Sequence, residues 1–336
     1  MPTNWPFGGR FLAIAGCVTL LCMVFLLTPS SRLETRPSKF WHSDDSLQSE
    51  AKQISPSPVA ESHPLHTPQP NHPKCGVTKV TMLYGGHKDP IFEHAVASHR
   101  RHSERWGCGF VELKYDVAPR KLYSKHYILL STMIQELAKP EDQRQKWLMW
   151  IDADSILINP GLSPEIFLPP DHIKDVYALM TADHNGLNDG VFFLRVDPIS
   201  LDLLTHTAAY PIAHPDDDVG FHGEQAAMAR VISSLETQAG TDFSGIAWLP
   251  RPWFNTYQFA QGFEGEPGHM MVHFAGVGPT RNPKMQAWLD ELSQNQAKWE
   301  IEFEQTFYKD AVAKYWEEFS VNKTAHIGGH DSNPHK

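Results

Sequence analysis

Residues 147–160 read WLMWIDADSILINP, from Trp147 to Pro160, an almost wholly apolar run that two carboxylates interrupt. The apolar residues predict a buried strand in a sheet that is covered on both faces. A buried carboxylate is costly unless it is paired, hydrogen-bonded or bound to a metal. Asp152 and Asp154 at the end of this strand therefore indicate a hard divalent cation, which carboxylates and substrate phosphates would bind together. The alternative is that both aspartates cap the turn that follows.

The whole chain has 336 residues, four cysteines and a net charge of −10, and it contains no long basic run. This length fits one large domain or two modest ones with tails, and the acidity argues against nucleic acid as a partner. Cys17 and Cys22 lie in an N-terminal apolar stretch, whereas Cys75 and Cys108 could form a disulfide in an oxidising lumen. Neither pair has the spacing of metal ligands, and whether Cys75 and Cys108 pair stays open.

The N-terminal part of the chain predicts a membrane anchor. Residues 11–27 carry no charge, and their number is at the short end of the about 17–25 residues that a spanning helix needs. A cleaved signal peptide is the main alternative, but the run is longer than the usual apolar core and no small-residue cleavage motif closes it. Residues 28–74 are rich in Pro, Ser and His without periodicity, as in a flexible stem. We expect a cytoplasmic tail over 1–10, a transmembrane signal anchor over 11–27, a disordered stem over 28–74, a globular domain over 75–320 and a disordered tail over 321–336.

The globular part predicts an α/β fold. Strand patterns at 79–84, 109–115, 147–151, 176–180 and 190–196 are interspersed with helical patterns at 92–106, 127–138 and 224–232. This alternation predicts a mostly parallel sheet with helices on both faces and ligands at the carboxyl ends of its strands. The first strand ends in Tyr84, Gly85 and Gly86, where the glycine pair either lets the backbone approach a ligand or simply forms a turn.

Four blocks between about residues 79 and 278 resemble the fungal α-galactosyltransferase and mannan-polymerase subunit family, glycosyltransferase family 34, which is related to plant xyloglucan xylosyltransferases. They are the histidine-rich stretch 98–107, residues 136–140 with 147–160, the stretch GLNDGVFFLR at 186–195, and EQAAM at 224–228 followed by HFAG at 273–276. All four blocks occur in the same order as in the family. Together they are a more specific signal than any single block would be.

The resemblance implies a GT-A fold, in which a Rossmann-like sheet binds a nucleotide-sugar beside an acceptor-binding half. It implies retaining, Mn²⁺-dependent transfer of a hexose, most simply galactose from UDP-galactose, onto an α-mannoside glycan. With the expected anchor, it implies a single-pass type II protein of the Golgi membrane with a lumenal catalytic domain. The sequon at Asn322 would then be lumenal.

Other functions remain alternatives on the sequence alone. One is a mannosyltransferase subunit of a mannan-making complex that uses GDP-mannose, and another is a non-catalytic sugar-binding or scaffold subunit. A metal-dependent hydrolase fits less well because the chain lacks a His-rich pattern for two metals. Assembly into a glycosyltransferase complex or a homo-oligomer is compatible with every one of these functions, and the sequence does not fix the donor or the linkage.

The resemblance assigns the metal ligands residue by residue. Asp152 and Asp154 match the Asp-x-Asp site that holds the metal and the diphosphate, and His273 matches the late histidine ligand of the family. A shell that mixes carboxylates with a neutral imidazole favours Mn²⁺ over Mg²⁺. Plant members carry a lysine at the position of Gly278 that meets the diphosphate, and we expect Arg281 to replace it as a forked phosphate donor.

The same resemblance predicts the residues around the sugar. Asn188 and Asp189 match a block near the donor sugar, although a plain turn would also use these residue types. Glu224 and Gln225 match residues that face the anomeric centre, although an acidic residue at a helix N-terminus has a simpler explanation. The expected donor-binding residues are Tyr84, Gly85, Asp152, Asp154, Asn188 and Arg281, and the expected catalytic residues are Glu224, Gln225, Asn188 and Asp189. Attack of the acceptor from the leaving-group side is favoured over a covalent intermediate on Glu224.

Overall fold

The computed structural model describes residues 75–83, 89–118, 120–220, 222–238 and 245–328, without the side chains of 236–238 and 322–328. All of these residues belong to the unit formed by residues 64–336. The predicted cytoplasmic tail, anchor and stem, together with Tyr84 and Gly85, lie outside the described residues. Within the described part, no helix combines the length and the apolarity needed to cross a membrane.

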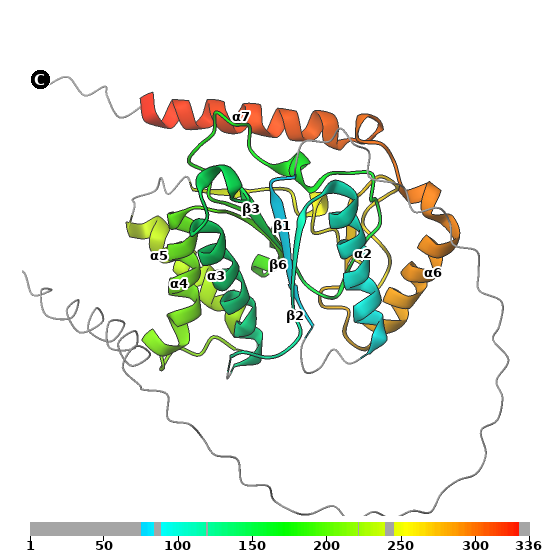
Figure 1. Ribbon diagram of the computed structural model, residues 1–336, viewed down its shortest axis with the longest axis horizontal. Helices are drawn as coiled ribbons and strands as arrows, with labels where there is room; N and C mark the ends of the chain where they lie inside the picture. The colour runs from blue at the N-terminus through cyan, green and yellow to red at the C-terminus, as the bar shows by residue number, and fades with distance from the viewer. Residues whose placement is uncertain (1–74, 84–88, 119, 221, 239–244, 329–336) are drawn as a thin grey trace, which may run out of the picture. The chain divides into compact units, whose positions relative to one another are not determined.

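A six-stranded sheet in the order β2-β1-β3-β6-β5-β7 forms the centre of the described fold (Figure 1). Its strands are β1 (Val77–Met82), β2 (Gly109–Leu113), β3 (Trp147–Ile151), β5 (Ala178–Asp183), β6 (Gly186–Arg195) and β7 (Ile246–Trp248). β6 pairs antiparallel with β3 and β5, whereas β1 with β2, β1 with β3, and β5 with β7 pair in parallel. The prediction of a mostly parallel sheet is therefore confirmed, with β6 reversed.

Helices cover both faces of this sheet, as the alternating pattern predicts (Figure 1). One group consists of α3 (Ser124–Leu137), α4 (Pro198–Ala213) and α5 (Gly223–Gln238), and the other of α2 (Pro90–Trp106), α6 (Arg281–Trp299) and α7 (Tyr308–Gly328). Because successive side chains of a strand point to opposite faces, Leu148 and Trp150 pack with the first group. Trp147 and Met149 share a second core with α7.

The stretch 147–160 does not form one continuous strand. β3 ends at Ile151, the chain turns through Asp152 and Asp154, and β4 (Ser155–Leu157) then pairs with β8 (Met271–His273) in a separate antiparallel sheet. In this register Ser155 lies opposite His273. The turn therefore brings both aspartates to the carboxyl end of β3, and the second sheet brings the late histidine beside them.

The histidine-rich block lies on α2 and forms hydrogen bonds with β4. The ring of His99 lies 3.2 Å from the carbonyl of Ser155, and the backbone N–H of Leu157 donates to Ser98 Oγ at 3.0 Å. A disulfide between Cys75 and Cys108 ties the start of β1 to the end of α2. The first pair of contacts fixes the strand that follows the Asp-x-Asp turn, so this block positions the site without entering it.

Some elements differ from the sequence prediction. The pattern did not reveal α4, α6 or α7, because their apolar residues do not form a clear stripe. α7 continues to Gly328, beyond the expected end of the domain at residue 320. The Asn322 sequon thus lies on a helical backbone, while its side chain is outside the described part.

Candidate active site

Three candidate ligands converge where β3 ends. Asp152, Asp154 and His273 each offer one ligand atom, and these atoms lie within 4.8 Å of one another. His273 Nε2 is 3.3 Å from Asp154 Oδ1 and 4.0 Å from Asp152 Oδ2. The side chains of His273 and Asp154 are 3% and 13% exposed, and that of Asp152 is 32% exposed. Two carboxylates and one imidazole at these distances fit a divalent cation, with room left for a ligand on the exposed side.

Strand β6 itself holds the other side of this cluster, so Asn188 and Asp189 lie in a strand and not in a plain turn. The backbone N–H of Asp152 donates to the carbonyl of Gly190 at 2.8 Å, and the Trp150 indole N–H donates to Asp152 Oδ1 at 2.7 Å. Position 190 must be glycine in this arrangement, because a Cβ there would lie 2.3 Å from His273 Cε1. The glycine therefore gives the imidazole its space beside the two aspartates.

Arg281 contacts the cluster from the start of α6. Its Nη1 donates to Asp154 Oδ2 at 3.1 Å, and its guanidinium lies over the ring of Phe92 at 5.1 Å. Burial acts to raise the pKa of Asp154, but the hydrogen bond and charge of His273 and the charge of Arg281 outweigh it and hold this pKa well below its ordinary value. The buried Nε of Arg281 has no hydrogen-bond partner among the described residues. The side chain thus has donor capacity left for an anionic ligand.

Lys125 is a buried cation of the site that the sequence did not reveal. Its Nζ lies 2.9 Å from Asp189 Oδ1 and 3.6 Å from Asp152 Oδ1, and it donates to the carbonyl of Asp189 at 2.9 Å. Burial disfavours the charge, but Asp152, Asp189 and Glu224 together raise the pKa of Lys125 above its ordinary value. Lys125 therefore stays protonated and joins the Asp-Asp-His cluster to Asp189, one of the residues expected around the sugar.

We predict that Lys125→Met lowers the free energy of unfolding by about 3–5 kcal/mol, because it leaves a buried carboxylate without its cation. Asp189→Asn in the same chain removes that charge and should restore more than half of the loss. Urea denaturation of the single and double variants measures both effects. Lys121→Met, a change at an exposed lysine of the neighbouring turn, is the control and should stay within about 0.5 kcal/mol of the wild type. Equal losses in the single and double variants would contradict the pairing.

Glu224 and Gln225 lie at the start of α5, where the charge of Glu224 acts on Lys125. The backbone N–H of Asp189 donates to Gln225 Oε1 at 3.2 Å. Burial raises the pKa of Glu224 to about 7, against the opposing charge of Lys125. Within the described part, Glu224 Oε2 is buried without a hydrogen-bond partner. Beside it lies a cavity of about 340 Å³ lined by Arg120, Lys121, Leu122, Tyr123, Val219, Gly220, Gly223 and Glu224.

The structure connects the described residues that the sequence singled out. Asp152, Asp154, His273 and Arg281 form one cluster, and Asp189 and Gln225 join it through Lys125. Asn188 reaches it in a different way than expected, because its Oδ1 accepts hydrogen bonds from Gly190 and Asn255. Its amide oxygen is thus engaged within the protein. Sequence reasoning missed Lys125 and Asn255, which belong to no recognisable motif.

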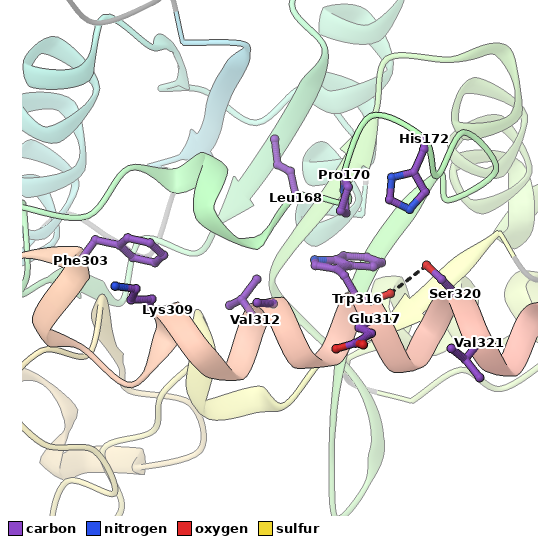
Figure 2. Close-up of a pocket in the computed structure, with 11 residues that line it drawn as sticks. Leu168, Pro170, His172, Phe303, Lys309, Val312, Trp316, Glu317, Ser320 and Val321 are labelled. Carbon is purple, nitrogen blue, oxygen red and sulfur yellow. Dashed lines mark hydrogen bonds between the residues drawn. The ribbon is translucent and has the colours of Figure 1, made fainter.

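A second groove, of about 640 Å³, lies along α7, away from this cluster. Figure 2 shows the side chains that line it, among them Leu168, Phe303, Val312, Trp316 and Val321. None of the expected site residues lines it. The groove is mainly apolar, and the group of candidate metal ligands found among the described residues does not line it.

Fold and cluster together define an α/β protein with a candidate divalent-cation site at the carboxyl end of a central strand. Residues 169–284 match the model of the galactosyl transferase GMA12/MNN10 family. This match confirms the resemblance to that family seen in the sequence blocks.

Two curated proteins of Schizosaccharomyces pombe are similar to the chain. One, "Probable alpha-1,2-galactosyltransferase gmh1", is 25% identical over 39% of this chain and 48% of its own length. The other, "Alpha-1,2-galactosyltransferase", is 22% identical over 66% of each chain. The chain thus spans about half of the length of the first relative and about two thirds of the second. A solved glycosyltransferase involved in the glycosylation of the major capsid of PBCV-1 overlaps it with a TM-score of 0.48 at 11% identity, covering 63% of this chain and 99% of that one.

Proposed function

We propose that the chain is a Mn²⁺-dependent retaining hexosyltransferase with a GT-A fold. Its proposed reaction moves galactose from UDP-galactose onto an α-mannoside glycan. The observation that carries the proposal is the convergence of Asp152, Asp154 and His273 at the carboxyl end of β3, where an open α/β sheet binds its ligands. The two Schizosaccharomyces pombe relatives are named as α-1,2-galactosyltransferases, one of them as a probable one, which supports galactose as the sugar.

Asp152, Asp154 and His273 would hold the cation, which supplies charge to stabilise the departing diphosphate. Arg281 would hold the diphosphate beside it, because its guanidinium already lies at Asp154 and its Nε is unengaged within the described part. A guanidinium fork binds phosphate oxygens in pairs. Arg281 thus supplies the contact to the diphosphate that a lysine at the position of Gly278 supplies in the plant members.

The residues around Lys125 would orient the sugar. Lys125 pairs with Asp189, and Gln225 accepts a hydrogen bond from the backbone N–H of Asp189. These contacts hold polar side chains of α3, α5 and β6 in fixed positions next to the cation site. Rigid placement is required because an error of about 1 Å can cost on the order of 100-fold in rate. The acceptor would enter through the cavity beside Glu224. Its hydroxyl would attack on the side from which the diphosphate leaves, and a diphosphate oxygen would take the proton.

The purified protein with Mn²⁺, labelled UDP-galactose and an α-mannoside tests this reaction. We expect sugar transfer in the wild type and none in Asp154→Asn, which keeps the shape of the side chain but removes its charge. GDP-mannose in a parallel reaction distinguishes a mannosyltransferase. Nucleotide-sugar binding without turnover would indicate a scaffold subunit, and acceptor-independent release of free sugar would indicate a hydrolase. Either of the last two results would contradict the proposal.

We further propose that the protein is a type II membrane protein of the Golgi with residues 75–328 in the lumen. The uncharged run at 11–27 and the Asn322 sequon support this topology. Protease added to sealed microsomes should leave the globular part intact and should digest it once detergent opens the membrane. Digestion without detergent would exclude this orientation.

A further inference from the structure

Asn255 is a fully buried residue that lies between His273 and Asn188 of β6. Its Oδ1 lies 2.7 Å from His273 Nδ1. Its Nδ2 donates to Asn188 Oδ1 at 2.8 Å and to Thr181 Oγ1 at 2.9 Å. Every polar atom of this amide is thus engaged, and one of its partners is a candidate metal ligand. No sequence motif includes Asn255.

The direction of these hydrogen bonds follows from a backbone group. The N–H of Gly190 can only donate, and it donates to Asn188 Oδ1 at 3.1 Å. The atom of Asn188 that meets Asn255 is therefore an oxygen, so the facing atom of Asn255 is its NH₂ group. The remaining amide atom of Asn255 is its oxygen, which can only accept. His273 must consequently carry a hydrogen on Nδ1.

We propose that Asn255 is a positioning residue that fixes the protonation of His273 so that Nε2 becomes its metal-binding atom. With Nδ1–H committed to Asn255, Nε2 is the atom that faces Asp154 Oδ1 at 3.3 Å. In this tautomer Nε2 carries a lone pair that a cation can accept. Histidine ligands of metals commonly have their second ring nitrogen fixed in this way. The inference rests on the metal site of the proposed function.

The surrounding backbone keeps the imidazole in this orientation. The N–H of His273 donates to the carbonyl of Thr256 at 2.7 Å, and its carbonyl accepts from the N–H of Gln258 at 2.8 Å. The segment that carries Asn255 therefore runs alongside β8. The ring also contacts Tyr257 edge-on, with centroids 5.6 Å apart, and it occupies the space that a Cβ at position 190 would need. Asn255 and the ring are thus held in register independently of any ligand.

Mn²⁺ binding to the purified protein, followed by electron paramagnetic resonance of the free ion, tests this role without any turnover. Asn255→Ala should weaken Mn²⁺ binding about 10- to 100-fold, the usual effect of losing such a partner. Asn255→Asp keeps an oxygen toward Nδ1 and should bind Mn²⁺ more tightly than Asn255→Ala. Thr181→Val removes a different hydrogen bond of the same amide and should bind Mn²⁺ as the wild type does.

Nitrogen-15 spectra of labelled histidine in the metal-free protein at alkaline pH give the second readout. His273 should show a hydrogen on Nδ1 in the wild type and a mixture of tautomers in Asn255→Ala. Wild-type Mn²⁺ affinity in Asn255→Ala, with affinity lost in His273→Ala, would overturn the role of Asn255 and leave the metal site standing. Equal weakening in Asn255→Asp, Asn255→Ala and Thr181→Val would also overturn it. Wild-type affinity in both Asp154→Ala and His273→Ala would instead refute the metal site itself.

Discussion

Asp154→Ala should lower the rate of sugar transfer at saturating Mn²⁺ by at least about 1,000-fold, which corresponds to about 4 kcal/mol of transition-state stabilisation. The variant removes one candidate ligand and leaves Arg281 without its carboxylate partner. Asp154 lies in the turn between β3 and β4, and the side chain of Arg281 is 36% exposed and can be solvated, so the fold should remain. Initial rates with labelled UDP-galactose measure the loss of transfer, and the melting temperature shows whether the fold is retained.

The control for this prediction is Asp202→Ala, which removes an exposed aspartate on α4 that lies 3.4 Å from the ring of the exposed His206. It should transfer sugar at the wild-type rate. Near-native turnover of Asp154→Ala would show that the cluster does not serve the reaction. A melting temperature far below that of the wild type would show instead that the loss of activity reflects unfolding.

Glu224→Gln should slow transfer by about 10- to 100-fold and leave the α configuration of the product unchanged, because same-side attack needs no protein nucleophile. The change keeps the shape of the side chain and removes the charge that favours an oxocarbenium-like centre. Since burial raises the pKa of Glu224 to about 7, the carboxylate forms as the pH rises through that value. The wild-type rate should therefore rise through pH 7, and the variant should lack this rise. Product anomers and a pH–rate profile measure both effects.

A covalent route makes the opposite prediction for Glu224→Gln. The variant would then be inactive, azide would restore turnover with inverted products, and mass spectrometry of the intact wild-type protein would find a glycosylated Glu224. Observation of that adduct would exclude same-side attack. Gln225→Ala serves as the comparison, because it should lose sugar positioning while keeping the pH dependence that Glu224 provides.

The sequence predicted those parts of the molecule that depend on local patterns. The run 147–151 is apolar at every position, which marks a strand buried on both faces, and the two aspartates after it are too costly to bury without a partner. The sequence could not show that the run breaks into β3 and β4, since the break depends on pairing between Ser155 and the distant His273. That pairing turns two separate motifs into one cluster.

Other features of the site depend on tertiary contacts that leave no local signal. Lys125 lies on a helix, where a lysine is normally solvated, and only the packing of α3 against β3 and β6 buries it between carboxylates. Asn255 follows a short turn with no motif around it, and its role appears only once β8 lies alongside it. A carboxylate that the sequence predicts to be buried implies that a cationic partner lies beside it in the fold. The sequence does not identify which residue that partner is.

The most direct test of the proposed reaction is the anomeric configuration of the first product formed from UDP-galactose and an α-mannoside with Mn²⁺. Proton NMR recorded during the reaction distinguishes an α-linked galactoside from a β-linked one while the first product is still forming. The predicted product is α-linked, and its formation stops when Mn²⁺ is chelated and resumes when Mn²⁺ is restored. A β-linked product, or transfer that continues unchanged in the presence of the chelator, would contradict it.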